Sequence, residues 1–323
     1  MTQHESQLPE SLLRRSDGGL RRVGFEIEFG GLTFDDCLAQ LSRALGGSVD
    51  RASAIEAKIA HPEFGDFELE LDWQFLKEQA REAYMQDDVM KIIGDIAGTV
   101  VPLEVVFPPI DANRLDITND IVKVLHDAGA SGTHSSPLYA FGVHINTELP
   151  DLEASTLTRY LKAYALLQQW LIRAHSVDSS RRISPYVDPY KRRYLNLVID
   201  YDSPDVSQIL GDYLEHNATR NRALDMLPFF SMIDADRVQR AVQDSRVNAR
   251  PAFHYRMPNC DIGNPDWSLI TEWNRWCVVE QLAASDELET LADRHRHWRT
   301  AEIFPNESHW LQTIDDWIAG NLT

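Results

Sequence analysis

The sequence predicts an α+β fold built around a largely antiparallel sheet. The chain has 323 residues, of which 43% are hydrophobic and 25% are charged, so it is long enough to bury a large core. Segments with strand-like alternation and segments with helical spacing follow one another along most of the chain. The connections between them mix hairpin lengths with helical lengths, which favours α+β.

Strands and helices alternate in the first half of the chain. Residues 21–32 predict a strand that ends at Gly30-Gly31. Thr33 is placed to cap the helix that follows, and Gly46-Gly47 is placed to end it. We expect further strands over 64–73, 100–110 and 139–149, and further helices over 75–97 and 115–128.

Longer helices are predicted in the second half. Asp151 is placed to cap a helix whose apolar stripe runs from Leu157 to Leu171. Residues 193–199 and 250–262 predict strands, whereas 205–218, the run after Leu224 and the chain from Ser268 onward predict helices. The spacing of Trp267, Trp273 and Trp276 favours positions in the core.

We expect one domain over residues 21–323, with a helical C-terminal part, after a flexible polar tail over residues 1–20. The tail lacks the apolar core of a signal peptide, and no apolar run is long enough to span a membrane. Cys37, Cys260 and Cys277 have no metal-like spacing, so free thiols in a reducing compartment are expected. We therefore expect a cytoplasmic protein.

The charge of the chain excludes whole classes of partner. With 31 basic and 50 acidic side chains, the net charge is −19. Nucleic acids and anionic membranes are not expected partners, because phosphate groups need a basic footprint. The charge is compatible with a cationic or amine-bearing partner, but also with ordinary solubility. The sequence leaves the oligomeric state open.

Alternation along the strands predicts one polar sheet face. Since successive side chains of a strand point to opposite faces, Glu26 and Glu28 oppose the apolar Phe25, Ile27 and Phe29. The same rule collects Glu26, Glu28, Glu68, Glu70, Asp72, Glu104, His144, Asn146, His254 and Arg256.

This polar face has two possible interpretations. It is either a solvated sheet face or a ligand site. Two carboxylates on one strand face lie about 7 Å apart and, where partly dry, repel by about 2 kcal/mol. A divalent cation between them would remove that cost, and oxygen-rich sites select Mg²⁺, Mn²⁺ or Ca²⁺ over Zn²⁺.

Basic residues are concentrated in one stretch of this acidic chain. The stretch contains Arg173, Arg181, Arg182, Lys191, Arg192 and Arg193, followed by Arg220 and Arg222. It is either a solvated loop or a clamp for a polyphosphate, whose oxygens match arginine forks. The P-loop, dinucleotide-binding, nucleophile-elbow and H-E-x-x-H motifs are absent from the sequence.

The ordered motifs GFEIEF, LELDW, PLEVVFPPI, FGVHIN, KRRYLNL, HNATRNRALDMLP and FHYR resemble the amidoligase family of the glutamine synthetase and glutamate–cysteine ligase superfamily. The resemblance runs from about Arg22 to about Glu280 and implies a curved antiparallel sheet with a polar concave face and helices on the other side. It also implies an ATP-dependent carboxylate–amine ligase that uses Mg²⁺ or Mn²⁺ and forms an amide through an acyl phosphate. Its substrates would be small-molecule or peptide carboxylates and amines.

The resemblance assigns roles residue by residue. Glu26, Glu28, Glu104 and His144 would be metal ligands. Asn146, Lys191, Arg192, Arg193 and Asn196 would contact the nucleotide, its phosphates or the substrate. Arg256 would stabilise the transferring phosphoryl group, with Glu104 and His254 as further catalytic residues.

Two departures from the family pattern keep other functions open. His254 stands where relatives usually carry an acid, and Trp73-Gln74 follows Asp72 where relatives often have a D-G-S-like turn. One alternative is a non-catalytic relative that binds nucleotide or peptide. Another is a metal-dependent hydrolase of amide or isopeptide bonds on the same scaffold.

Overall fold

A computed structural model describes residues 5–71, 102–135, 141–177, 181, 187–244, 247–301 and 306–322. The predicted helix over 75–97, the residues Asp72, Trp73 and Gln74, and Arg182 lie outside this described part.

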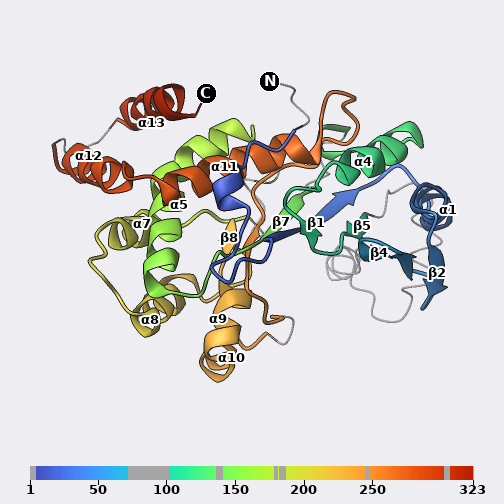
Figure 1. Cartoon of the computed structure of the whole chain (residues 1–323), viewed down its shortest axis with the longest axis horizontal. Coiled ribbons are helices and arrows are strands. Elements are labelled where there is room, and N and C mark those ends of the chain that lie inside the picture. Colours follow the sequence, from blue (N-terminus) through green and yellow to red (C-terminus); the bar gives the residue numbers. More distant parts are fainter. Residues whose placement is uncertain are drawn as a thin grey trace, which may run out of the picture.

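The sheet is the centre of the described structure. Its paired strands are antiparallel and follow the order β2-β3-β4-β5-β1-β7-β9-β8, with β6 pairing with β1 (Figure 1). The strands are β1 (Arg22–Phe29), β2 (Ser48–Arg51), β3 (Glu56–His61), β4 (Gly65–Leu71), β5 (Leu103–Val106), β6 (Ile110–Asp111), β7 (Val143–Glu148), β8 (Leu224–Asp225) and β9 (Ala252–Tyr255). The predicted α+β class with a mostly antiparallel sheet is confirmed.

Helices occupy the connections and the C-terminal part. They are η1 (Glu10–Leu12), α1 (Phe34–Leu45), α4 (Ile117–Asp127), η2 (Thr133–Ser135), α5 (Ala154–Ala174), α7 (Arg192–Ile199), α8 (Val206–Asn217), α9 (Leu227–Ile233), α10 (Ala235–Val242), α11 (Leu269–Ala284), α12 (Leu288–Ala301) and α13 (Glu307–Asn321). The Thr33 side chain caps α1, and Gly46 ends it at a left-handed φ of 65°, as predicted. Among the described helices, none has the length and apolar character needed to cross a membrane.

Two local predictions are wrong. Residues 193–199 belong to helix α7 and not to a strand, and the buried residues Tyr194 and Val198 are four positions apart, which is one helical turn. Helix α5 begins at Ala154 with Glu153 as its N-cap, so Asp151 does not cap it directly. Asp151 instead accepts a hydrogen bond from the backbone N–H of Glu153 at 3.0 Å.

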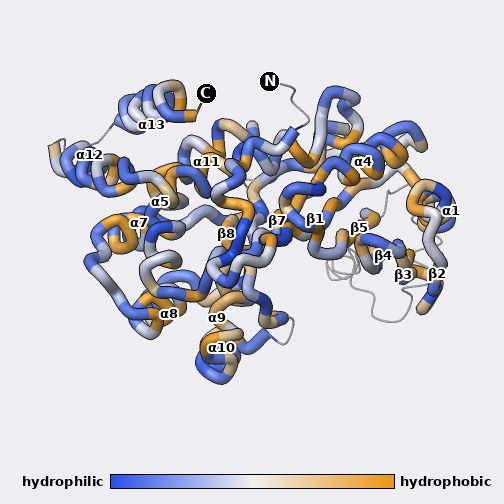
Figure 2. The backbone as a smooth tube through the Cα atoms, in the orientation of Figure 1, coloured by the Kyte–Doolittle hydropathy of each residue, from blue (hydrophilic) through white to orange (hydrophobic). Residues whose placement is uncertain are grey.

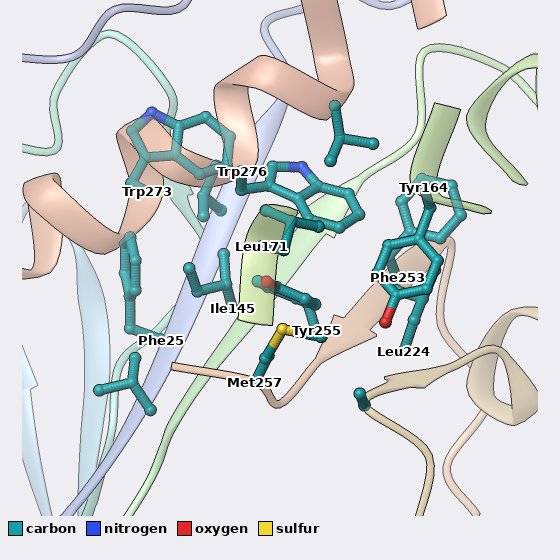
Figure 3. Close-up of a cluster of buried hydrophobic side chains, with 14 of the residues drawn as sticks. Phe25, Ile145, Tyr164, Leu171, Leu224, Phe253, Tyr255, Met257, Trp273 and Trp276 are labelled. Carbon is teal, nitrogen blue, oxygen red and sulfur yellow. The ribbon is translucent and has the colours of Figure 1, made fainter. Parts of the chain in front are cut away.

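The apolar side chains of β1, β7 and β9 form the core with α5 and α11. The ring of Tyr255 lies 4.8 Å from that of Trp276 and meets that of Tyr164 edge-on at 6.2 Å, measured between ring centroids. Figure 3 shows Trp273 and Trp276 above the side chains of these strands. Trp267, Trp273 and Trp276 are all buried, as their spacing predicted. Figure 2 shows hydrophobic and hydrophilic residues mixed along α1 and α4, as expected of helices that cover a core on one side.

Residues 5–20, where the sequence predicts a flexible tail, run beside α11 and the end of β7. The indole N–H of Trp273 donates to the Ser6 hydroxyl at 2.9 Å, and Leu8 is buried. The backbone N–H of Ser16 donates to the carbonyl of Pro150 at 2.9 Å. These contacts place this segment against the apolar side of the sheet and its covering helices.

Candidate functional site

The register of the central strands brings polar residues together on the sheet face opposite the core. Glu26 of β1 pairs with His144 of β7, and Asn146 of β7 pairs with His254 of β9. His254 also pairs with Asp225 of β8. Residues directly opposite in an antiparallel pair point to the same side, so these five side chains share one face.

A row of carboxylates crosses four neighbouring strands on the same face. Glu28 pairs with Glu104, Glu104 with Glu70, and Glu70 with Glu56. Like charges directly opposite each other destabilise a sheet, so such a row favours a bound cation. Burial and the charges of Glu68 and Glu56 raise the pKa of Glu70.

Glu26 is the centre of the polar face. Its Oε2 lies 2.6 Å from Nδ1 of His144 and 3.7 Å from Nε2 of His254. Its Oε1 accepts a hydrogen bond from Asn146 at 2.8 Å and lies 3.8 Å from Nη2 of Arg250. Burial alone would raise the pKa of Glu26, but His144, His254 and Arg250 together hold it well below its usual range.

His254 is buried beside Glu26 with an incomplete set of hydrogen bonds. Its Nε2 has no hydrogen-bond partner among the described residues. Its Nδ1 lies 3.8 Å from Oδ2 of the buried Asp225. Burial lowers the pKa of His254 well below its usual value, and burial raises the pKa of Asp225 to about 6.

Two groups of side chains on this face have the geometry of a metal site. One comprises Glu26, His144 and His254, and the other comprises Glu28, Glu104 and His144. In each group, one ligand atom per residue lies within 4.8 Å of the others. The structure therefore brings together all four residues predicted as metal ligands, together with His254.

The backbone of Gly142 holds Glu28 in place, and the Arg181 side chain lies against Gly142. The backbone N–H of Gly142 donates to Oε2 of Glu28 at 2.7 Å. The buried guanidinium of Arg181 donates to the carbonyls of Met257 and Arg256, both at 2.9 Å, and also to that of Pro258. A Cβ atom at position 142 would overlap this guanidinium, at 3.1 Å from its Cζ, so the close approach requires glycine.

The opposite end of the face is basic. Arg256 directly follows β9, and its Nη1 donates to the carbonyl of Arg220 at 2.8 Å. Arg220, Arg250 and Arg256 all lower the pKa of Asp225 against the effect of burial, so their charges lie close to it. The face thus runs from a carboxylate row to an arginine group, which suits cations at one end and anions at the other.

Comparison with known proteins identifies the family. A family model described as "Putative amidoligase enzyme" matches residues 20–278, most of the chain. The chain belongs to this amidoligase family. Family members are named as enzymes that form amide bonds. No curated protein and no solved structure matches the chain.

The matched region of this amidoligase contains both metal-ligand groups and the arginine group. Sequence reasoning did not single out Arg250 or Asp225. Arg250 has the same strand parity as His254 and Arg256, so alternation extended backward along the chain would have found it. Asp225 lies on the two-residue strand β8, which is too short to show a period.

Four of the predicted nucleotide-binding residues lie at the start of a helix and not on a strand of the sheet. Lys191, Arg192, Arg193 and Asn196 lie at the start of α7, which packs against α5 and α8. Lys191 donates to Asp188 at 3.0 Å, and Arg299 of α12 donates to the carbonyl of Asn196 at 3.5 Å. Asn146, by contrast, joins the Glu26 cluster directly.

Proposed function

We propose that this amidoligase is an ATP- and Mg²⁺-dependent carboxylate–amine ligase that works through an acyl phosphate. The observation that carries the proposal is the polarity of one sheet face, where Glu28 and Glu104 lie at one end and Arg250 and Arg256 at the other. Carboxylates that hold Mg²⁺ and arginines that hold phosphates are the two parts of a phosphoryl-transfer site.

The residues present fit a magnesium ion at the carboxylate end. Mg²⁺ is usually bound through one or two carboxylates together with substrate phosphates, and Glu28 and Glu104 supply two. The Gly142 N–H already orients Glu28 by its hydrogen bond to Oε2. The other oxygen, Oε1, lies 3.7 Å from His144 Nε2 and would be the one that binds the ion. When bound, the ion would neutralise charge on the phosphates.

The proposed reaction has two steps. A substrate carboxylate oxygen attacks the γ-phosphorus, so a P–O bond forms while the bond to ADP breaks. The amine nitrogen then attacks the acyl carbon, a C–N bond forms, the C–O bond to phosphate breaks, and the proton of the amine passes to solvent. In the first step, Arg256 and Arg250 would stabilise the charge that develops on the transferring group.

Calorimetric titration of Mg²⁺·ATP into the purified chain tests the nucleotide site. We expect Glu28→Gln to weaken Mg²⁺-dependent ATP binding by at least about tenfold, as removal of a charged ligand costs more than about 1.4 kcal/mol. Glu63→Gln is the matched control, because Glu63 is exposed and pairs with Arg114. Absence of ATP binding at millimolar concentration, or equal binding by Glu28→Gln, would overturn the site.

Arg256→Ala tests the catalytic step. We expect this variant to lower the rate of ADP release more than the affinity for ATP, since the charge of Arg256 matters most in the transition state. ADP release should require both a carboxylate and an amine. Equal losses in the rate of ADP release and in ATP affinity would make Arg256 a binding residue only. Cleavage of an amide or isopeptide bond without ATP would instead favour a metal-dependent hydrolase.

A further inference from the structure

Glu26, His144 and His254 form a compact donor set beside the proposed magnesium end. The donors are one carboxylate and two imidazoles, and both histidines are buried. Metal–ligand bonds of about 2.1 Å place neighbouring ligand atoms about 3–4 Å apart. The 3.7 Å between Glu26 Oε2 and His254 Nε2 already matches this spacing.

The unpartnered Nε2 of His254 points to a ligand at this place. The His254 side chain is only 6% exposed, and Nε2 has no hydrogen-bond partner in the described part of the chain. Buried polar atoms without partners are uncommon and costly. A metal ion bound to Nε2 would give this atom its missing partner.

Each of the three donors has a polar group behind it. Asp225 lies 3.8 Å from Nδ1 of His254, and Glu28 lies 3.7 Å from Nε2 of His144. Asn146 donates to the second oxygen of Glu26. Histidines that bind metals almost always have a carboxylate, carbonyl or water at their other nitrogen, which fixes the tautomer.

We propose that Glu26, His144 and His254 bind a first-row divalent transition ion, of the Zn²⁺, Fe²⁺ or Co²⁺ type, in preference to Mg²⁺. Imidazole suits these ions, whereas Mg²⁺ prefers oxygen ligands and gives up its water reluctantly. The family resemblance implies Mg²⁺ or Mn²⁺ throughout, so the two-imidazole donor set is where this chain departs from that expectation.

His144 decides how the two groups share their ligands. In the structure its Nδ1 lies in hydrogen-bond contact with Glu26, 2.6 Å away. Binding of the transition ion would displace the proton between these atoms and open the pair by about 0.5–1 Å. The imidazole then carries its proton on Nε2, facing Glu28, so that Glu28 and Glu104 remain an all-oxygen pair.

The test measures metal binding by the full chain without ATP. Metal-free protein is titrated with Co²⁺ in a large excess of Mg²⁺, and binding is followed by the visible absorption of Co²⁺, which changes when protein ligands replace water. Metal content after dialysis with Zn²⁺ is measured in parallel. We expect about one tightly bound ion per chain, and binding at least about tenfold weaker in His254→Gln, since loss of a group behind a ligand already costs about 10–100-fold.

Two further variants keep the test decisive. His297→Gln removes an exposed histidine of α12 and should bind Co²⁺ like the unchanged chain. His254→Glu keeps a ligand at this position and should shift the preference toward Mg²⁺, even if His254→Gln folds poorly. Loss of Co²⁺ and Zn²⁺ to excess Mg²⁺ by the unchanged chain, or equal binding by His254→Gln, would overturn the proposal. Metal binding with no ATP binding would overturn only the ligase proposal.

Discussion

Two buried polar clusters lie along the β1–β7 strand pair, and they are satisfied in different ways. In the first, the two terminal guanidinium nitrogens of Arg21, Nη1 and Nη2, donate to Glu280 at 2.8 and 2.9 Å. The same carboxylate accepts from the Trp276 indole at 2.8 Å and from the Tyr160 hydroxyl. Arg21 is 1% exposed and Glu280 0%, so this cluster is closed by protein groups alone.

The second cluster, around Glu26, is not closed in this way. Its carboxylate has partners, but His254 Nε2 has none in the described structure, and the 3.7 Å to Glu26 is too long for a hydrogen bond. A closed cluster stabilises the fold, because breaking it leaves a buried charge unpaired. An open one is better suited to a ligand, since an ion or phosphate can complete it.

Glu280→Gln should have the largest effect on stability. Removing one partner of a buried ion pair typically costs about 3–5 kcal/mol. Urea unfolding measures the loss, and Glu63→Gln is the control, because Glu63 is 56% exposed and its partner Arg114 is 45% exposed. If the free energy of unfolding fell by less than about 1 kcal/mol, the Arg21–Glu280 cluster would not be a main source of stability.

His295 tests whether an unpartnered ring nitrogen is enough to mark an open cluster. Its Nδ1 also lacks a partner among the described residues, but its ring packs against Trp298 and Trp310. Burial lowers the pKa of His295 from its ordinary 6.5 to about 4. The unfolded chain therefore binds more protons between these values, and stability is lost as the pH falls from about 6.5 to 4.

Between pH 6.5 and 4, the protonation of His295 in the unfolded chain lowers the free energy of unfolding by about 3 kcal/mol. Urea unfolding at several pH values should show a shallower loss in His295→Gln than in the unchanged chain, with His297→Gln as the control. We expect no Co²⁺ binding at His295. Parallel pH profiles for the two proteins would contradict the role of its burial.

Metal addition should separate the two clusters directly. At a Zn²⁺ concentration 100 times the dissociation constant, binding to the folded state alone adds about 2.7 kcal/mol of stability. We expect this increment in the unchanged chain and in Glu280→Gln, each compared with its own metal-free form, but not in Glu26→Gln. Thermal unfolding with and without Zn²⁺ measures it, and an increment retained in Glu26→Gln would show that the ion binds elsewhere.

Strand alternation predicted much of the candidate site. Because the side-chain period of a strand is two, Glu26, Glu28, Glu104 and His144 could be placed on one face from their positions alone. The pairing of the strands, which brings Glu28 opposite Glu104, is set by tertiary packing and could not be predicted in this way.

The clustering of basic residues in the sequence did not by itself show which of them lie on the sheet. Lys191, Arg192 and Arg193 are adjacent in sequence to other basic residues, but α7 is helical and packs against α5, beside α12. Of the arginines whose charges act on Asp225, Arg250 and Arg256 flank β9, and Arg220 comes from another part of the chain. Strand alternation links Arg250 with Arg256, but only the folded structure brings Arg220 close to them.

Of the substitutions considered, Gly142→Ala should have the smallest effect on stability. It should also change Mg²⁺·ATP binding. The added Cβ would push against the Arg181 guanidinium, whose three carbonyl contacts limit how far it can move, and would lie 3.4 Å from Oε2 of Glu28. Overpacking of this kind costs about 1–3 kcal/mol. Urea unfolding measures that cost, and calorimetry measures Mg²⁺·ATP binding.

If the Glu26 and Glu28 side of the sheet is the ligand site, Gly142→Ala should weaken Mg²⁺·ATP binding while leaving the Arg21–Glu280 cluster intact. Gly320→Ala is the control, because nothing lies within 4 Å of a Cβ built at that position. A stability loss with unchanged ATP binding would mean that Arg181 and Gly142 only join β7 to the segment after β9. ATP binding could instead fall by more than the loss of stability explains. In that case the hydrogen bond from the Gly142 N–H would be needed to orient Glu28 for metal binding.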